Sequence, residues 1–176
     1  MGTILIVRAV IALVAAMVIT FSSNHAAVVG LIVFMGFGFA LAGVLMFSIP
    51  FVGLHGVAKT TTGIFSISSV VAAGLAAAMM GGGLPALLVV VSTWAAIAAA
   101  MELYAGYRST DKALSREWLS MGVLTAVLAI VMAVVPMNEV YAVGIFGAYA
   151  AIIGVFQVIA GISLRTDARH TNEVSS

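Results

Sequence analysis

The sequence predicts an all-α, polytopic integral membrane protein with six transmembrane helices, arranged as three helical hairpins with both termini cytoplasmic. Three observations support this fold class. Of the 176 residues, 64% are hydrophobic and only 7% are charged, whereas a soluble domain carries about 25% charged residues. The apolar residues gather into six runs of membrane-spanning length. With six crossings drawn, all the basic residues fall on one side of the membrane.

The run that orients the others is 86–106, which is uncharged except for Glu102. A stretch of about 20 apolar residues is long enough for one helical crossing of a bilayer. The polar segment that follows carries five charged residues, which are Arg108, Asp111, Lys112, Arg116 and Glu117. Because most of them are basic, the positive-inside rule places this segment in the cytoplasm.

The other runs have similar lengths, and in chain order the six predicted helices cover roughly 3–21, 27–47, 63–80, 86–106, 118–135 and 142–164. The separators 22–25, 81–85 and 136–139 are short and turn-like, so the helices they join should be antiparallel neighbours. The connection 48–62 is longer, contains Pro50, and has room for a short interfacial stretch. We therefore expect a transmembrane domain over 1–165 and a polar cytoplasmic tail over 166–176.

The seven basic residues set the topology, and they are Arg8, Lys59, Arg108, Lys112, Arg116, Arg165 and Arg169. The loops on the opposite side contain one charged residue, Glu139. Misplacing any one helix would spoil this segregation. Both termini are therefore expected in the cytoplasm, with the three hairpin tips facing outward.

A weak internal repeat relates the fourth and sixth runs. The segment Trp94-Ala95-Ala96-Ile97 reappears as Tyr149-Ala150-Ala151-Ile152, and in the same frame Glu102 aligns with Gln157. The physical interpretation is a helical hairpin used three times.

Trp118 opens the fifth run, Gly122 lies inside it, Pro136 follows it, and an aromatic–small–glycine helix ends at Gly161-Ile162. This pattern of the fifth and sixth runs resembles the HdeD-like acid-resistance membrane protein family. The resemblance is clearest over 116–165 and weakest over the first two runs, where Arg8-Ala9 stands in place of an expected glycine. It implies a six-helix protein of the bacterial cytoplasmic membrane linked to acid tolerance, and it carries over no catalytic residues.

Two charged residues lie inside the apolar runs, and they define a candidate intramembrane polar cluster of Arg8, Glu102 and Gln157. At 1.5 Å per residue, Arg8 and Glu102 both lie about 6–8 Å below the cytoplasmic edge. One arrangement lets Arg8 snorkel to the interface while Glu102 faces Arg108 or Lys112. A second pairs Arg8 with Glu102, near Gln157, and a third makes Glu102 a proton-relay carboxylate. We predict the pair, because leaving either charge alone in the bilayer is costly.

Signals of enzymatic chemistry are missing from the sequence. There is no paired-carboxylate motif, nucleophile elbow, phosphate loop or histidine pair at ligand spacing, and there are no cysteines for thiolate metal sites. A net charge of +1 gives no reason to expect nucleic acid binding. We therefore expect that the chain is not an enzyme and binds no cofactor and no metal. We expect the lipid bilayer to surround it.

Three classes of function are compatible with these features. The first is a non-catalytic accessory or scaffold subunit bound to other membrane protein subunits, for example in a bacterial respiratory supercomplex. The second is a stand-alone HdeD-like stress protein. The third is a small proton or solute transporter, which the scarcity of polar residues along the helices disfavours.

Overall fold

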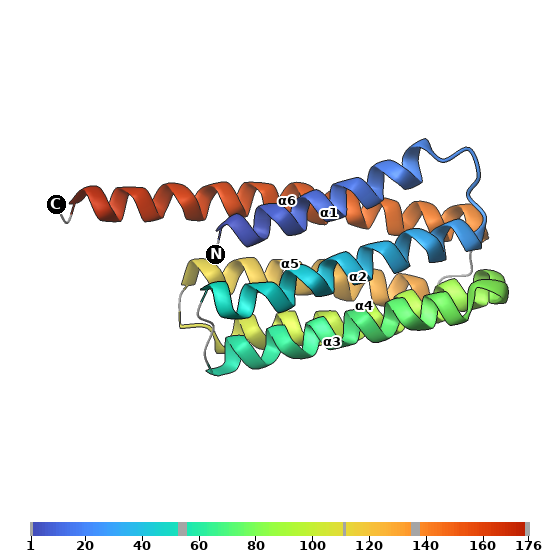
Figure 1. The fold of residues 1–176 in the computed structure, drawn as a ribbon, viewed down its shortest axis with the longest axis horizontal. Coiled ribbons are helices and arrows are strands. Elements are labelled where there is room, and N and C mark those ends of the chain that lie inside the picture. Colours follow the sequence, from blue (N-terminus) through green and yellow to red (C-terminus); the bar gives the residue numbers. More distant parts are fainter. Residues whose placement is uncertain (1, 53–55, 111, 135–137, 175–176) are drawn as a thin grey trace.

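The computed structural model describes residues 2–52, 56–110, 112–134 and 138–174, and these form six long α-helices (Figure 1). The helices are α1 (Gly2–Phe21), α2 (Ala27–Val52), α3 (Gly56–Ala78), α4 (Gly83–Arg108), α5 (Lys112–Val134) and α6 (Glu139–Val174). A short 3₁₀ helix, η1 (Met80–Gly82), joins α3 to α4. All six α-helices are long and apolar enough to cross a membrane. The prediction of an all-α chain with six such helices is confirmed.

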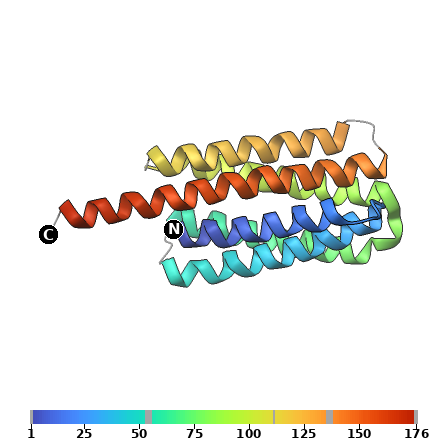
Figure 2. The same ribbon diagram turned by 90° about the horizontal axis from the view of Figure 1, so that it is seen from above.

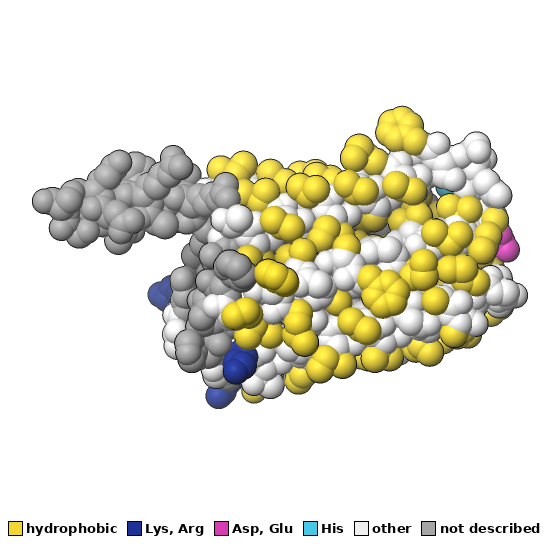
Figure 3. Space-filling model, viewed as in Figure 1, with side chains coloured by type: hydrophobic (Ala, Val, Ile, Leu, Met, Phe, Trp, Pro, Cys, Tyr) yellow, Lys and Arg dark blue, Asp and Glu magenta, His cyan; other side chains and the backbone are white. Residues whose placement is uncertain are grey.

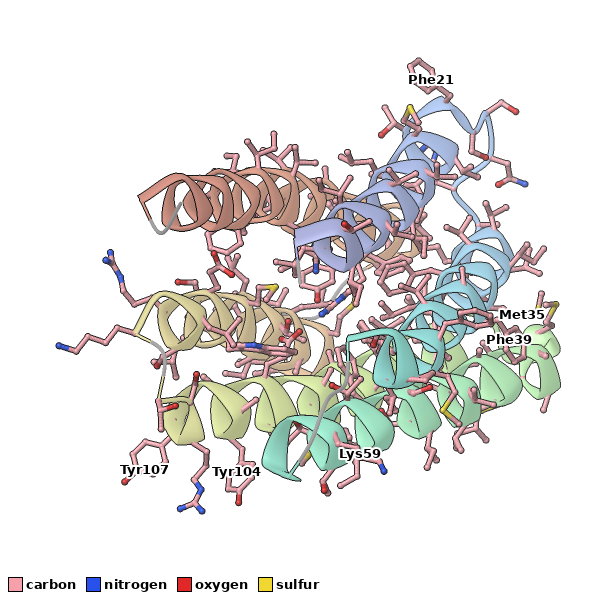
Figure 4. The ribbon with its side chains drawn as sticks, turned by 60° about the vertical axis from the view of Figure 1, so that its left-hand side comes forward. Phe21, Met35, Phe39, Lys59, Tyr104 and Tyr107 are labelled. Carbon is pink, nitrogen blue, oxygen red and sulfur yellow. The ribbon has the colours of Figure 1, made fainter. Side chains whose placement is uncertain are left out.

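Successive helices run in opposite directions along one long axis, so α1 begins and α6 ends at the same end of the bundle (Figures 1 and 2). The Lys and Arg side chains seen in Figure 3 gather at this end, and an acidic side chain lies at the opposite one. We call these the basic end and the far end. Lys59 on α3 and Tyr104 and Tyr107 on α4 project outward at the basic end (Figure 4).

The helices that pack most closely are α4 with α5, α1 with α6, and α2 with α3, rather than the two helices of each predicted hairpin. Glycines explain two of these contacts, because a missing Cβ lets helix backbones approach. On α6, glycines seven residues apart face bulky side chains of α1; they are Gly147, Gly154 and Gly161, which meet Ile19, Leu13 and Ile6. Between α4 and α5 the fit is reciprocal, with Gly106 against Leu119 and Gly122 against Leu103.

An aromatic cluster fills the middle of the bundle. Trp94 on α4 meets Phe34 and Phe37 on α2 edge to face, at ring-centroid distances of 5.4 and 5.6 Å. Phe146 on α6 packs on the same two phenyl rings, and all four side chains are buried. The indole Nε1 of Trp94 donates a hydrogen bond to Ser69 Oγ over 3.1 Å, so this deep tryptophan is also satisfied as a donor.

Helices extend into several segments that the sequence assigns to loops. The predicted connection 48–62 is mostly helical, because α2 continues to Val52 and α3 begins at Gly56, whose φ is +58°. Pro50 does not stop α2, since it lies in the last turn and removes only one backbone hydrogen bond. The predicted tail 166–176 continues α6 as helix through Val174. His55, Asp111 and Pro136, also assigned to loops, lie outside the described residues.

Candidate functional site

The structure pairs Arg8 of α1 with Glu102 of α4. Arg8 Nη2 lies 3.6 Å from Glu102 Oε1, and the two side chains are only 4% and 3% exposed. Arg108 and Lys112, by contrast, are exposed at the basic end. Arg8 therefore does not snorkel, and the arrangement is the buried pair that their matched depth predicts.

Local packing holds the Arg8 guanidinium between elements that are distant in the sequence. Its Cζ lies 5.5 Å from the centre of the Phe65 ring on α3 and 5.8 Å from that of Trp118 on α5. A cation over an aromatic face is attracted by the ring quadrupole, and the attraction grows when water is excluded. Arg8 thus contacts α3, α4 and α5 from its position on α1.

A buried threonine connects the carboxylate to two further helices. Thr125 Oγ1 on α5 lies 2.8 Å from Glu102 Oε2, 2.9 Å from the Met121 carbonyl and 3.0 Å from the Tyr149 hydroxyl of α6. A threonine hydroxyl has one proton to donate. If it donates to the ionised Glu102, the Tyr149 hydroxyl donates to Thr125. The result is a chain of donors directed at one carboxylate, and we call Arg8, Glu102, Thr125 and Tyr149 the polar network.

Gln157, the third member of the predicted cluster, forms no hydrogen bond with the ion pair among the described residues. Its Nε2 donates to Met121 Sδ over 3.6 Å, and thioether sulfur is a weak acceptor. Its Oε1 is buried without a hydrogen-bond partner among the described residues. Met121 precedes Thr125 by one helical turn, so both lie on the same face of α5. Gln157 of α6 therefore lies beside the polar network without being part of it.

Sequence reasoning missed Thr125 and Tyr149. Thr125 carries a recognisable signal, since it is the one hydrogen-bonding side chain in the otherwise apolar stretch 121–134. Tyr149 is harder to recognise, because the internal repeat aligns it with Trp94, an aromatic residue of the core. Both complete the site because a buried carboxylate needs more hydrogen bonds than one arginine provides.

The chemistry available to the polar network is limited. It holds one charge pair and a chain of hydroxyl groups, and it offers no activated nucleophile. Among the described residues, no group of three or more His, Asp or Glu side chains could hold a metal ion. Its effect is structural, since it links α1, α4, α5 and α6 at the depth of Glu102.

No protein-family model, curated protein or solved structure matches the chain. The resemblance to HdeD-like proteins therefore stays a prediction from sequence motifs.

Proposed function

We propose that the chain is a non-catalytic, multi-pass protein of the bacterial cytoplasmic membrane that serves as an accessory or scaffold subunit of a larger membrane assembly. The observation that carries this proposal is the separation of the polar network from the far end by the aromatic cluster. In such a bundle the polar groups fix the helices to one another, and aromatic side chains fill the middle.

The filled middle argues against the transporter alternative. On α4, Trp94 lies eight residues before Glu102, about 12 Å further from the basic end at 1.5 Å per residue. The Ser69 hydroxyl beside Trp94 already accepts the indole N–H and donates to the Phe65 carbonyl. A proton or solute path needs polar groups through the membrane depth. Among the described residues, no buried polar side chain lies past this point, and Thr20 and Thr93 on the far-end side are exposed.

Two apolar grooves on the outer surface favour contact with other membrane components. One lies between α3 and α4, encloses about 510 Å³ and is lined largely by aliphatic side chains such as Val71 and Val89. The other lies between α1 and α2, encloses about 340 Å³, and has Gly36 and Ala40 in its lining. Gly36 has open space where a Cβ would be. A small-residue stripe of this kind allows a neighbouring helix to approach closely.

The proposal places the basic end in the cytoplasm, because Lys59, Arg108, Lys112 and Arg116 are exposed there. A reporter that is active only in the cytoplasm, fused after Ser176, should be active. The matched reporter that works only outside should be silent. The reverse pattern would invert the topology.

The accessory role is tested by isolating the tagged protein, expressed at its natural level, in native-membrane nanodiscs without detergent exchange. We expect it to carry a second membrane protein at fixed stoichiometry, and Gly36→Leu to release that protein without lowering the unfolding temperature. Gly144→Leu is the matched control, because Gly144 is also helical with open space at its Cβ position. A chain that stays alone in the nanodisc would favour the stand-alone HdeD-like alternative, and solute or proton flux in proteoliposomes would favour transport.

A further inference from the structure

A small cavity lies beside Arg8 at the basic end of the bundle. It encloses about 30 Å³ between α1, α2, α3 and α5. Its polar lining consists of Arg8, Ser48, Thr62 and Glu117. Arg8, Ser48 and Thr62 are buried, so these groups are shielded from bulk solvent although the cavity lies near the end of the helices.

The Arg8 guanidinium is incompletely satisfied by the protein. Nη2 faces Glu102, whereas the buried Nε has no hydrogen-bond partner among the described residues. A buried donor without an acceptor is destabilising, and more so when it belongs to a charged group. An acceptor is therefore expected next to Nε, and the cavity is the space available for it.

Water fits this cavity in both size and chemistry. A water molecule needs about 10–15 Å³ of probe-occupied volume and two to four polar partners, so a volume of about 30 Å³ has room for one or two. The Ser48 hydroxyl donates to the Leu45 carbonyl over 2.6 Å, which leaves its lone pairs free to accept. An inorganic anion fits less well, because the carboxylates of Glu102 and Glu117 flank Arg8. A cation is opposed by Arg8 itself.

We propose that this cavity is a water-binding vestibule, in which one or two water molecules bound to Arg8 Nε and the neighbouring hydroxyls hydrate the ion pair from the basic end alone. The polar network then runs from Tyr149 through Thr125, Glu102 and Arg8 to this water. The aromatic cluster around Trp94 separates the polar network from the far end of the bundle. The inference does not depend on the accessory role, since a stand-alone protein would bind the same water.

The first test uses the unsubstituted protein and compares two methionines of α5. Met121 lines the cavity and Met132 does not, yet both are 1% exposed. Millisecond X-ray radiolysis turns bound water into hydroxyl radicals, which oxidise the nearest methionine to its sulfoxide. We expect Met121 to be oxidised several-fold faster than Met132, by mass spectrometry of peptides. Equal rates for the two methionines would overturn the proposal.

The second test determines from which side the water enters. The chain has no cysteine, so in Ser48→Cys or Thr62→Cys the new thiol is the only one. The silver ion, which is small, reacts with the thiolate, and a thiolate forms far more readily in water than in apolar surroundings. Silver added on the basic side of sealed vesicles should block later maleimide labelling of the denatured protein. Silver added on the other side should not.

Two matched substitutions complete this design. Ser69→Cys places a thiol at the buried serine beside the Trp94 indole, and it should react at least about tenfold more slowly because its thiol stays un-ionised. Thr60→Cys lies exposed at the basic end and gives the rate of an open site. Rates for Ser48→Cys and Thr62→Cys as slow as that of Ser69→Cys, or equal rates from the two sides of the vesicle, would contradict one-sided hydration.

Discussion

Replacing Glu102 by glutamine should destabilise the protein mainly by stranding Arg8. The Arg8 Nη2 to Glu102 Oε1 distance is 3.6 Å, at which two unit charges attract by about 4–5 kcal/mol for an effective dielectric constant of about 20. Removing one partner of a buried pair typically costs about 3–5 kcal/mol, because the other charge stays buried alone. In the Glu102→Gln variant the rings of Phe65 and Trp118 still attract the Arg8 guanidinium. We therefore expect a loss at or just below the lower end of that range, about 2–3 kcal/mol.

The second substitution, Arg8→Leu, turns this expectation into a test of pairing. Alone, it strands Glu102, which among the described residues keeps only the hydrogen bond from Thr125. Combined with Glu102→Gln, it removes both charges, and replacing a whole buried pair by neutral groups is often nearly neutral. The double variant should therefore lose no more stability than either single variant. That outcome corresponds to a coupling energy of about 2–3 kcal/mol, at the upper end of measured pairwise values.

The measurement is equilibrium unfolding of the wild type and the three variants in mixed detergent micelles, followed by the loss of helical circular dichroism. The same cycle on Arg108→Leu and Glu102→Gln is the control, because Arg108 is exposed and forms no pair with Glu102. Effects of Arg8→Leu and Glu102→Gln that add within about 0.5 kcal/mol would mean that the two charges act independently. The buried pair would then be refuted as a source of stability.

Four further substitutions, one of them a control, probe the rest of the bundle with the same unfolding measurement. Thr125→Val should cost about 1.5–3 kcal/mol, because it removes a hydrogen bond to a charged group; a loss below half a kilocalorie would remove Thr125 from the network. Glu139→Gln should cost about 0.5–1 kcal/mol, because the Glu139 carboxylate accepts a 2.8 Å hydrogen bond from the Ala27 N–H at the start of α2; an unchanged stability would mean that this contact is dispensable. Gly154→Ala should cost about 1–3 kcal/mol, because the added Cβ would lie 2.7 Å from Leu13 Cγ. The control Gly144→Ala should be neutral or stabilising, because Gly144 has open space at its Cβ position. Equal effects of the two substitutions would refute the close α1–α6 contact.

The number and type of the helices are readable from the sequence, but their ends and their partners are not. Hydropathy identifies a spanning run because lipid excludes charged residues over a fixed thickness. Hydropathy does not indicate where a helix ends once the chain has reached water. For this reason α2 and α3 extend through most of the predicted connection 48–62. The short connections suggested hairpins, yet α1 packs most closely on α6, the helix furthest from it in the chain. That choice depends on whether a glycine on one helix meets a bulky side chain on another.

The candidate site was half predictable for a similar reason. Arg8 and Glu102 are conspicuous because each is an isolated charge in an apolar run, and matched depth on one side of the membrane is enough to suggest that they meet. Thr125 and Tyr149 are ordinary residues of transmembrane helices, and only the rotation of α5 and α6 about their axes brings them to Glu102. Gln157 is as polar as either, but the same rotation directs it to Met121.

The asymmetry of the bundle follows from these contacts. At the basic end, charge and hydroxyl groups join four helices through directional bonds that tolerate little sliding. In the middle, Trp94 and the phenyl rings around it pack edge to face, and towards the far end α1 and α6 meet through Gly147 and Ile19. Helices in lipid gain little from hiding apolar surface, so this packing alone would leave their register weakly fixed. The polar network supplies that register from one end, which is why its loss should loosen α1 against α4 before it disturbs the aromatic cluster.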